Sequence, residues 1–531
     1  MATSKCIIQF PILFIILSCL IAVSCAANNE EPLIKRECGY TRYPTLCVQT
    51  LTATNDQNID LLSALVNKTI HETNLPLSYF DSLIINSRLN SPAAQPIRTA
   101  IDDCDELMKM SLKRLNQAME LLQKSPKNHK ADIQTWLSAA LTFQQTCKDT
   151  MEEHVASNAY VGKIYNKMDY LSELISNPLA LVNRITGNPS ESPAGRRSLL
   201  QFPAWVSAGD RKLLQSTGAV KASAVVAKDG SGDFTTVSGA IQAATGGRFV
   251  IYVKSGTYNE KINTNKDGIT LIGDGKYSTV ISGGSSVGKG SNLRGSATFT
   301  ITGDGFIARD IGFQNTAGPE NHQAIALTVA SDHSVVYRCS ISGYQDTLYA
   351  LSLRQFYREC DIYGTVDFIF GNAAAVFQSC TLVLRRPRNG GAFNTILANG
   401  RSDPGQNTGF SVQNCKITVG ADFSPVKSSY DSYLGRPWKQ YSRAVVMQTN
   451  IDGEISSRGW AEWEGAAGST YRTLYFAEYE NMGPGGATSG RVNWPGFEVI
   501  GTAEAAKFTV SNFIGGNSWL PSTGVTFVSG L

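Results

Sequence analysis

Apolar residues recur at helical spacing in the first third of the chain. Between residues 97 and 122, and again between 133 and 147, they return every three, four or seven positions. Such a stripe buries one face of an amphipathic helix. Residues 59–72 and 160–175 are two further candidates. Four helices joined by short links predict an all-α four-helix bundle over residues 28–185.

The helical region contains four cysteines, Cys38, Cys47, Cys104 and Cys147. Sequence alone allows three pairings among them. Cys38 and Cys47 are close enough to clip a short hairpin. Cys104 and Cys147 each fall on the apolar stripe of a predicted helix, so they could tie two neighbouring helices together.

The pattern changes at Ala224. Short runs rich in β-formers, at residues 249–253, 268–272, 280–282 and 334–337, alternate with Gly, Asp and Asn turns. A helix is expected only near residues 236–244. Many short strands are typical of a sandwich, a barrel or a solenoid, so this pattern alone leaves the three folds open.

A repeat distinguishes among these folds. Three cysteines follow one another at intervals of 21 and 20 residues, and a fourth copy begins after a longer insertion. An apolar residue lies two positions after each cysteine; the pairs are Cys339 and Ile341, Cys360 and Ile362, Cys380 and Leu382, and Cys415 and Ile417. β-Strand repeats of this length stack into a solenoid. A parallel β-helix over residues 221–531 fits best, because the leucine-rich pattern is missing, and the chain is predicted to be multidomain.

The repeat brings two acids together. Asp346 and Asp367 each lie seven residues after their cysteine, so they occupy equivalent places on adjacent coils. Parallel strands are about 4.8 Å apart, which puts the carboxylates roughly 5–6 Å apart. Two negative charges at that range repel by about 3 kcal/mol, so one acid should stay protonated to a higher pH. A proton donor beside a nucleophile is the functional interpretation, and two solvated turn aspartates are the alternative.

Two amides, a guanidinium and several aromatic rings are candidates to lie near the two acids. Gln345 precedes Asp346, and Gln323 lies in the preceding coil; both can donate N–H groups to an oxyanion. Arg436 can pair with a carboxylate, and Trp438 offers a flat face for a sugar ring. Three further aromatic residues could extend that face or could simply belong to the core: Tyr349, Phe370 and Trp460.

Composition limits the partners. The chain has 531 residues, enough for two or three domains, and a formal net charge of +3, which argues against nucleic acid. Only 5 His are present, and neither CxxC nor HExxH occurs, so we expect no metal site and no cofactor.

Both ends of the helical region carry processing signals. An apolar run over residues 7–23, followed by Ser24-Cys25-Ala26-Ala27, predicts a signal peptide over residues 1–27 and hence secretion. A retained membrane anchor is the alternative, but the core at residues 12–23 is short for a span of about 20 residues. Asn67 begins a glycosylation sequon. Residues 186–220 form a linker with two dibasic pairs, where a protease could cut.

Several motifs resemble a known family. They are Gly343-Tyr344-Gln345-Asp346-Thr347-Leu348, Asp367-Phe368-Ile369-Phe370-Gly371, Leu434-Gly435-Arg436-Pro437-Trp438 and the stretch at residues 318–324. With them, residues from about 222 to 531 resemble the plant pectin methylesterases. Residues 38 to about 185 resemble the pectin methylesterase inhibitor domain, including its four-cysteine pattern.

The resemblance implies a right-handed parallel β-helix and a metal-free esterase of the cell wall. Asp367 would be the nucleophile, Asp346 the proton donor and then the base, and Gln323 and Gln345 the oxyanion donors. Arg436 and Trp438 would hold the substrate, pectin (homogalacturonan). The helical region would restrain activity, as in a zymogen, until a protease cuts the linker at Arg211-Lys212-Leu213-Leu214. A separate inhibitor protein is a further partner that the resemblance suggests.

The resemblance also implies disulfides. They would be Cys38–Cys47 and Cys104–Cys147 in the helical region and Cys360–Cys380 beside the nucleophile. Cys339 and Cys415 have no partner assigned.

Three other functions remain as alternatives. Gly284-Ser285-Ser286-Val287-Gly288 matches the GxSxG pattern of serine esterases, which needs a strand before it and a helix after it. A β-helical glycosidase or lyase is the second alternative, because paired carboxylates also serve glycoside hydrolysis. The helical half alone would suit a non-catalytic inhibitor or wall-binding protein.

Overall fold

The computed structural model describes residues 33–53, 60–85, 94–152, 159–185, 222–390 and 392–531. The predicted signal peptide and the linker over residues 186–220 lie outside these ranges. Within them, no helix combines the length and the apolar character that a membrane crossing requires.

The N-terminal part is helical, as the periodicity predicts. Its helices are α2 (Pro44–Thr52), α3 (Leu61–Ile85), α4 (Gln95–Lys124), α5 (Lys130–Glu152) and α6 (Ala159–Asn183). Leu115 of α4, Leu137 of α5 and Leu179 of α6 are fully buried in one core. The four long helices thus share the core that the apolar stripes predict.

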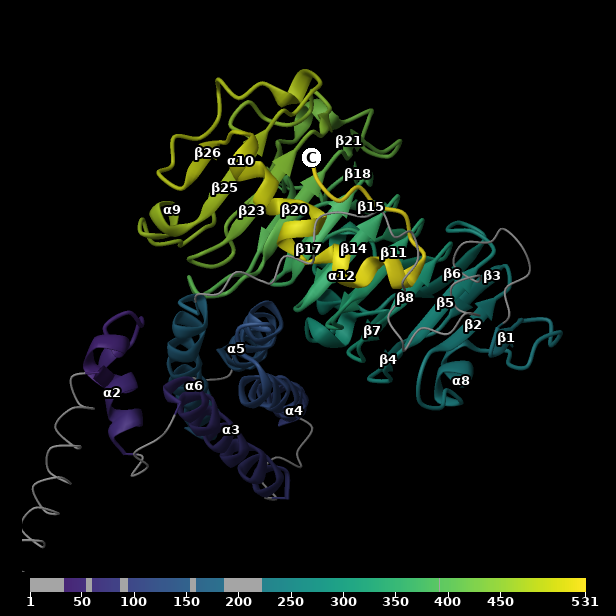
Figure 1. Ribbon diagram of the computed structural model, residues 1–531. Helices are drawn as coiled ribbons and strands as arrows, with labels where there is room; N and C mark the ends of the chain where they lie inside the picture. The colour runs from purple at the N-terminus through teal and green to yellow at the C-terminus, as the bar shows by residue number, and fades with distance from the viewer. Residues whose placement is uncertain (1–32, 54–59, 86–93, 153–158, 186–221, 391) are drawn as a thin grey trace, which may run out of the picture. The chain divides into compact units, whose positions relative to one another are not determined.

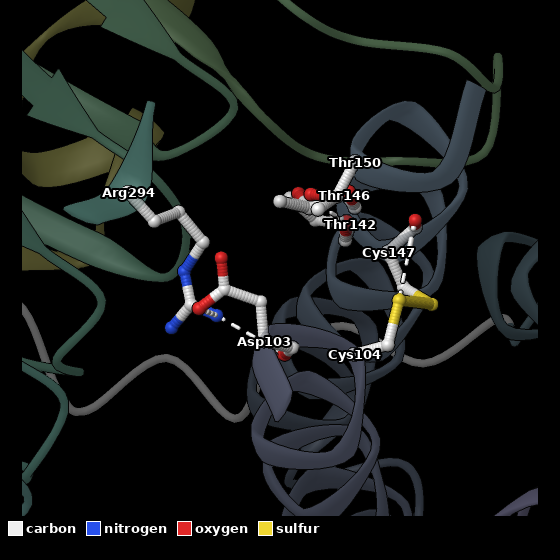
Figure 2. The surroundings of a disulfide bond; sticks show 7 residues. All are labelled: Asp103, Cys104, Thr142, Thr146, Cys147, Thr150 and Arg294. Atoms are coloured by element: carbon white, nitrogen blue, oxygen red, sulfur yellow. Dashed lines mark hydrogen bonds and ion pairs between the residues drawn. A yellow bond between two sulfur atoms is a disulfide. The ribbon is translucent and has the colours of Figure 1, made fainter. Parts of the chain in front are cut away.

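Two disulfides hold this helical part together. Cys38 pairs with Cys47, and Cys104 of α4 pairs with Cys147 of α5 (Figure 2). Both predicted pairings are confirmed. Near the second bond, the threonine hydroxyls of α5 donate to carbonyls one turn earlier in the helix, for example Thr142 to Ser138 at 2.8 Å. Such bonds give the threonine hydroxyls a backbone acceptor within their own helix.

The C-terminal part consists of three parallel sheets, called sheets A, B and C here (Figure 1). Sheet A comprises β1 (Ala224–Val226), β2 (Phe249–Val253), β5 (Ile269–Gly273), β8 (Ile307–Arg309), β11 (Ser334–Tyr337), β14 (Arg354–Arg358), β17 (Ala374–Gln378), β20 (Gly409–Gln413), β23 (Arg443–Met447), β25 (Tyr475–Tyr479) and β26 (Phe497–Val499). Sheet B comprises β3 (Gly256–Asn259), β6 (Thr279–Gly283), β9 (Gly312–Asn315), β12 (Ser340–Ser342), β15 (Asp361–Gly364), β18 (Thr381–Leu384), β21 (Lys416–Val419) and β24 (Asn450–Ile451). Sheet C comprises β4 (Ile262–Thr264), β7 (Phe299–Ile301), β10 (Leu327–Val329), β13 (Leu348–Ala350), β16 (Ile369–Gly371), β19 (Asn394–Asn399) and β22 (Ser432–Gly435).

Neighbouring strands in each sheet come from successive coils of the chain. From β4 to β22 each coil contributes one strand to each sheet in turn, which is a parallel β-helix, as predicted. The repeat positions stack in register: Ile341 pairs with Ile362, Ile362 with Leu382, and Leu382 with Ile417. These four side chains are at most 1% exposed. The sequence repeat is therefore a column of the core.

Each coil turns from sheet A to sheet B through a residue in the left-handed region. On four successive coils this residue immediately precedes the repeat cysteine: Arg338, Glu359, Ser379 and Asn414 have φ between 50° and 54°. A non-glycine residue rarely adopts such a φ, so its recurrence at one place shows that the coil geometry imposes it.

Helices cover the beginning of the β-helix and the outside of sheet A. The predicted helix near residues 236–244 is α8 (Val237–Gln242), and its Thr236 cap accepts a hydrogen bond from the Gly239 N–H. At the C-terminal end, α11 (Val510–Phe513) and α12 (Gly516–Trp519, labelled in Figure 1) pack on sheet A. Trp519 of α12 joins a cluster with Val335 and Phe356. The other short helices are α9 (Thr470–Thr473) and α10 (Thr502–Ala505).

Candidate active site

Asp346 and Asp367 lie at the same position on adjacent coils. Leu348 of β13 pairs in register with Ile369 of β16, and each aspartate precedes its strand residue by two positions. Both aspartates have left-handed backbones, with φ of 60° and 50°. The Asp346 N–H donates to the Val366 carbonyl at 3.0 Å, which ties the two loops together. The repeat therefore predicts the placement of both acids correctly.

Glycines make these two loops tight. A Cβ atom on Gly364 would lie 2.1 Å from the Cβ of Phe368, and one on Gly343 would lie 2.8 Å from Oγ1 of Thr347. Both approaches are too close for a real side chain. The glycines at equal offsets in the repeat thus allow the chain to fold back before each aspartate.

The Asp367 carboxylate is held on both oxygens. Arg436 donates from Nε to Oδ1 at 2.9 Å and from Nη2 to Oδ2 at 2.6 Å. Thr395, on the next coil, donates from Oγ1 to Oδ1 at 2.6 Å. The Asp367 side chain is 7% exposed. These donors stabilise a buried, ionised carboxylate in one orientation.

Asp346 has a different environment. It is buried, and within the described residues its carboxyl group makes no hydrogen bond or ion pair. Burial, and then the charge of Asp367, raise the pKa of Asp346 well above its ordinary value, while Arg436 opposes the shift. The two carboxyl groups therefore differ: that of Asp367 is bound by a guanidinium, whereas burial favours the protonated form of Asp346.

Arg436 follows the end of β22, where its backbone N–H donates to the Leu397 carbonyl at 2.9 Å. Burial alone would lower the pKa of its guanidinium, but the hydrogen bond to Asp367 and its charge raise that pKa above the ordinary value. The guanidinium lies 4.2 Å from the ring centroid of Trp463 and 5.4 Å from that of Phe393. Sequence reasoning missed both rings.

The two predicted amide donors come from neighbouring coils. The Ala324 N–H, next to Gln323, donates to the Gln345 carbonyl at 3.2 Å. Both glutamines are half-buried, and neither side-chain amide bonds to another residue in the described part of the chain. Their N–H groups are therefore available to a ligand.

The aromatic residues form a stack rather than an open platform. The ring of Tyr349 is 1% exposed and lies 4.2 Å from that of Phe370, which in turn lies 6.0 Å from the half-buried ring of Trp438. The structure thus brings Phe370 to Trp438 and places Tyr349 beneath them. The suggestion that Trp460 extends this surface is wrong: it is 0% exposed, and its ring packs on Phe476.

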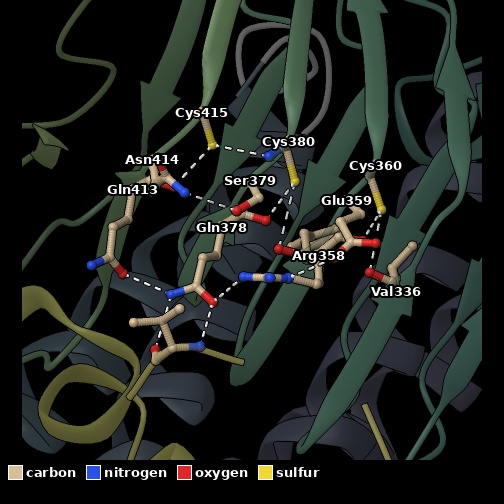
Figure 3. Close-up of polar contacts among 12 residues, drawn as sticks. Val336, Arg358, Glu359, Cys360, Gln378, Ser379, Cys380, Gln413, Asn414 and Cys415 are labelled. Carbon is tan, nitrogen blue, oxygen red and sulfur yellow. Dashed lines mark hydrogen bonds and ion pairs between the residues drawn. The ribbon is translucent and has the colours of Figure 1, made fainter. Parts of the chain in front are cut away.

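The Cys360–Cys380 disulfide implied by the resemblance is not formed. Cys339, Cys360, Cys380 and Cys415 are buried free thiols, and they form one column because the strands that follow them pair in register. Figure 3 shows the last three of them. The thiol of Cys360 donates to the Val336 carbonyl at 3.2 Å, and that of Cys380 to the Tyr357 carbonyl at 3.5 Å. Each thiol thus has a backbone acceptor in sheet A, and burial raises the pKa of both well above the ordinary value.

Two other sequence candidates have clear places. Ser286, in the GxSxG match, is fully buried before a three-residue 3-10 helix, so the strand–turn–helix elbow of a serine esterase is not formed. Asn67 lies exposed on α3. In the described ranges, no cluster of three or more His, Cys, Asp or Glu side chains is placed to hold a metal ion.

Family comparisons cover both parts of the chain. The sequence model described as Pectinesterase matches residues 223–517, and the one described as Plant invertase/pectin methylesterase inhibitor matches residues 32–181.

Individual relatives match along nearly the whole length. The chain is 50% identical over 496 residues to the probable pectinesterase/pectinesterase inhibitor 54 of Arabidopsis thaliana, covering 91% of this chain and 90% of that protein. It is 46% identical over 506 residues to pectinesterase 2 of Citrus sinensis, covering 94% and 95%.

Solved structures match the β-helical part. The pectin methylesterase from carrot has a TM-score of 0.58 at 50% identity, covering 60% of this chain and 100% of that one. The enzyme from Aspergillus niger has a TM-score of 0.50 at 29% identity, covering 57% and 97%.

Proposed function

The chain belongs to the pectinesterase family, with an N-terminal region of the plant invertase/pectin methylesterase inhibitor family, and on that premise we propose that it demethylates pectin with Asp367 as nucleophile. The reaction converts methyl-esterified polygalacturonate and water to pectate and methanol. The observation that supports this proposal is the unequal surroundings of the two acids: Arg436 binds the Asp367 carboxylate, whereas burial raises the pKa of Asp346 well above its ordinary value.

In the first step, the Asp367 carboxylate attacks the carbonyl carbon of a galacturonate methyl ester. The amides of Gln323 and Gln345 donate to the oxygen that becomes negative. As the tetrahedral intermediate collapses, the bond to methoxide breaks, and protonated Asp346 gives its proton to the departing methanol. The product of this step is an anhydride between Asp367 and the sugar acid.

In the second step, Asp346 is an ionised base. It takes a proton from a water molecule, whose oxygen attacks the galacturonyl carbonyl of the anhydride. The anhydride bond breaks, the free acid leaves, and Asp367 becomes a carboxylate again. Arg436 stabilises this carboxylate throughout. The half-buried ring of Trp438 contacts the sugar, while the buried rings of Phe370 and Tyr349 support it.

Methanol release from methyl-esterified pectin tests the proposal. Asp367→Asn removes the nucleophile with little change in size, and we expect a loss of at least about a thousandfold in kcat. Asp361→Asn is the matched control, because Asp361 lies on the same coil but bonds to Tyr277 on the outside of sheet B. Near-normal methanol release by Asp367→Asn would contradict the proposal. New chain ends without methanol would indicate a glycosidase or lyase instead.

The helical region is proposed to restrain the enzyme. The family model that matches it is named for inhibitors. A protease that cuts the linker near Leu214 would release the active part, in the cell wall after secretion. Esterase activity measured before and after that cut tests the idea, since a fully active uncut chain contradicts it. We also propose that exposed Asn67 is glycosylated and that a separate inhibitor protein binds the enzyme.

A further inference from the structure

One buried hydroxyl contacts the proposed nucleophile twice. Oγ1 of Thr395 accepts a hydrogen bond from the Asp367 backbone N–H at 2.8 Å and donates to the Asp367 carboxylate at 2.6 Å. Thr395 is 0% exposed and belongs to β19, the strand of the next coil. Ile369 pairs in register with Leu397, which puts Thr395 at the same register position as Asp367.

The two contacts define which way the hydroxyl proton points. A hydroxyl has one proton, and here its oxygen already accepts from the N–H, so the proton is free to go to the carboxylate. Asp346 on the preceding coil is held differently, because its N–H donates to the backbone carbonyl of Val366. At Asp367 the Thr395 hydroxyl, rather than a backbone carbonyl, accepts the bond from the backbone N–H, and it also donates a bond to the carboxylate.

This double contact acts on a strained residue. Asp367 has a φ of 50°, a conformation that costs free energy in a residue with a side chain. Its carboxylate must nevertheless stay within a narrow range of positions to attack an ester carbonyl. Arg436 bonds only to the carboxylate of Asp367, whereas Thr395 bonds both to the carboxylate and to the backbone N–H of that residue.

We propose that Thr395 is a positioning residue of the esterase, which fixes the backbone and the carboxylate of Asp367 in the orientation for attack. The inference rests on the proposed function, since it assumes that Asp367 is the nucleophile. It concerns the chemical step and leaves substrate binding to other residues.

Three substitutions of Thr395 separate its hydroxyl from its bulk. Thr395→Val keeps the shape without the hydroxyl, Thr395→Ala removes both, and Thr395→Ser keeps the hydroxyl without the methyl group. We expect the valine and alanine variants to lose about ten- to a hundredfold in kcat with KM within about threefold of wild type. Thr395→Ser should stay within about threefold in kcat. If the valine variant does not fold, the serine and alanine pair still isolates the hydroxyl.

Thr449→Val is the matched control for a purely structural effect. Thr449 is also 0% exposed, accepts from the Cys415 N–H at 3.3 Å and donates to the Met447 carbonyl at 3.0 Å. It lies between β23 and β24, at the bend from sheet A to sheet B, rather than in the loops that precede sheet C. We expect its kcat to stay near that of wild type, although both valine variants lower the melting temperature.

The outcomes distinguish this inference from the function on which it rests. A normal kcat in Thr395→Val, or equal losses of kcat in Thr395→Val and Thr449→Val, would overturn the positioning role. So would an activity of Thr395→Ser no better than that of Thr395→Ala. If Asp367→Asn remains active, the proposed function itself fails. If Asp367→Asn is inactive while Thr395→Val is unaffected, only the role of Thr395 fails.

Discussion

The Arg436 guanidinium binds both oxygens of the Asp367 carboxylate, with Nη2 2.6 Å from Oδ2 and Nε 2.9 Å from Oδ1. This pairing makes the two stacked acids unequal. Asp367 has a positive partner, whereas Asp346 lacks hydrogen bonds to the described residues, and its burial raises its pKa well above the ordinary value. In the proposed mechanism, this asymmetry gives each acid its own role in ester hydrolysis.

Replacing Arg436 by lysine should separate charge from geometry. Lysine keeps the positive charge but offers neither the two-pronged contact nor the stacking on Trp463. We expect Arg436→Lys to lose about a hundredfold in kcat. Arg436→Leu leaves the buried carboxylate unpaired and should cost about 3–5 kcal/mol of unfolding free energy. Steady-state kinetics and urea unfolding measure the two effects.

Arg458→Lys is the control for this substitution. Arg458 forms an exposed ion pair with Glu462, so its replacement should leave both quantities near their wild-type values. A fully active Arg436→Lys would mean that charge alone suffices at residue 436.

Asp346→Asn should change how stability depends on pH. The pKa of Asp346 is raised above 3.8 in the folded chain, so above that value the folded chain keeps a proton that the unfolded chain releases. Its contribution to stability is complete below the ordinary pKa and is lost as pH rises through the folded pKa. The asparagine variant has no such loss. The melting temperature of the variant minus that of wild type should therefore be higher at about pH 7 than at about pH 4, by about 2 °C or more.

Melting curves of both proteins across this pH range, together with methanol release, test the prediction. Parallel pH dependences of the two melting temperatures would show that Asp346 is not a buried neutral acid. Activity should fall in the variant even where its stability rises, since asparagine cannot donate the proton to methanol.

Gly400→Ala should displace the ring of Trp438. A Cβ atom at position 400 would lie 2.8 Å from Cε3 of Trp438. Because we propose that this ring contacts the sugar, we expect KM to rise about tenfold with kcat within about threefold of wild type. Gly501→Ala is the control, since its Cβ would meet no atom within 4 Å. An unchanged KM in Gly400→Ala would argue against a binding role for Trp438.

All four cysteines of the column should react as free thiols. Residues 222–531 contain four cysteines, and all four are free in the structure. After cleavage at the linker and denaturation without reductant, the C-terminal part should react with four equivalents of a thiol reagent. Before denaturation it should react with almost none, because the thiols are buried. Two equivalents after denaturation would mean that two neighbours of the column are joined.

The regular coils are the part of the fold that the sequence predicts well. Between Cys339 and Cys380 the repeat has nearly constant length, so the spacing alone aligns Ile341 with Ile362 and Asp346 with Asp367. Thr395 was missed because the insertion before β19 stretches the spacing from Asp367 to 28 residues. Only the strand pairing restores its register with Asp367.

Side-chain direction and sulfur chemistry were the harder features to predict. Trp460 and Trp463 lie three residues apart in one segment, and the sequence analysis considered only Trp460, either for the aromatic surface or for the core. A parallel β-bridge pairs Trp460 with Gly435, and the Trp460 side chain lies in the core. The ring of Trp463 instead contacts the Arg436 guanidinium. The stacked cysteines were correctly aligned, but stacking alone does not decide whether thiols pair or donate to backbone carbonyls.

Infrared difference spectroscopy can show whether Asp346 is protonated beside the Asp367 carboxylate. Subtracting the spectrum of Asp346→Asn from that of wild type isolates the carbonyl stretch of a protonated Asp346. We expect this band at neutral pH, and we expect it to disappear at a lower pH in Asp367→Asn than in wild type, because the neighbouring charge is gone. No protonated-acid band at neutral pH, or a band that Asp367→Asn leaves unchanged, would contradict the account.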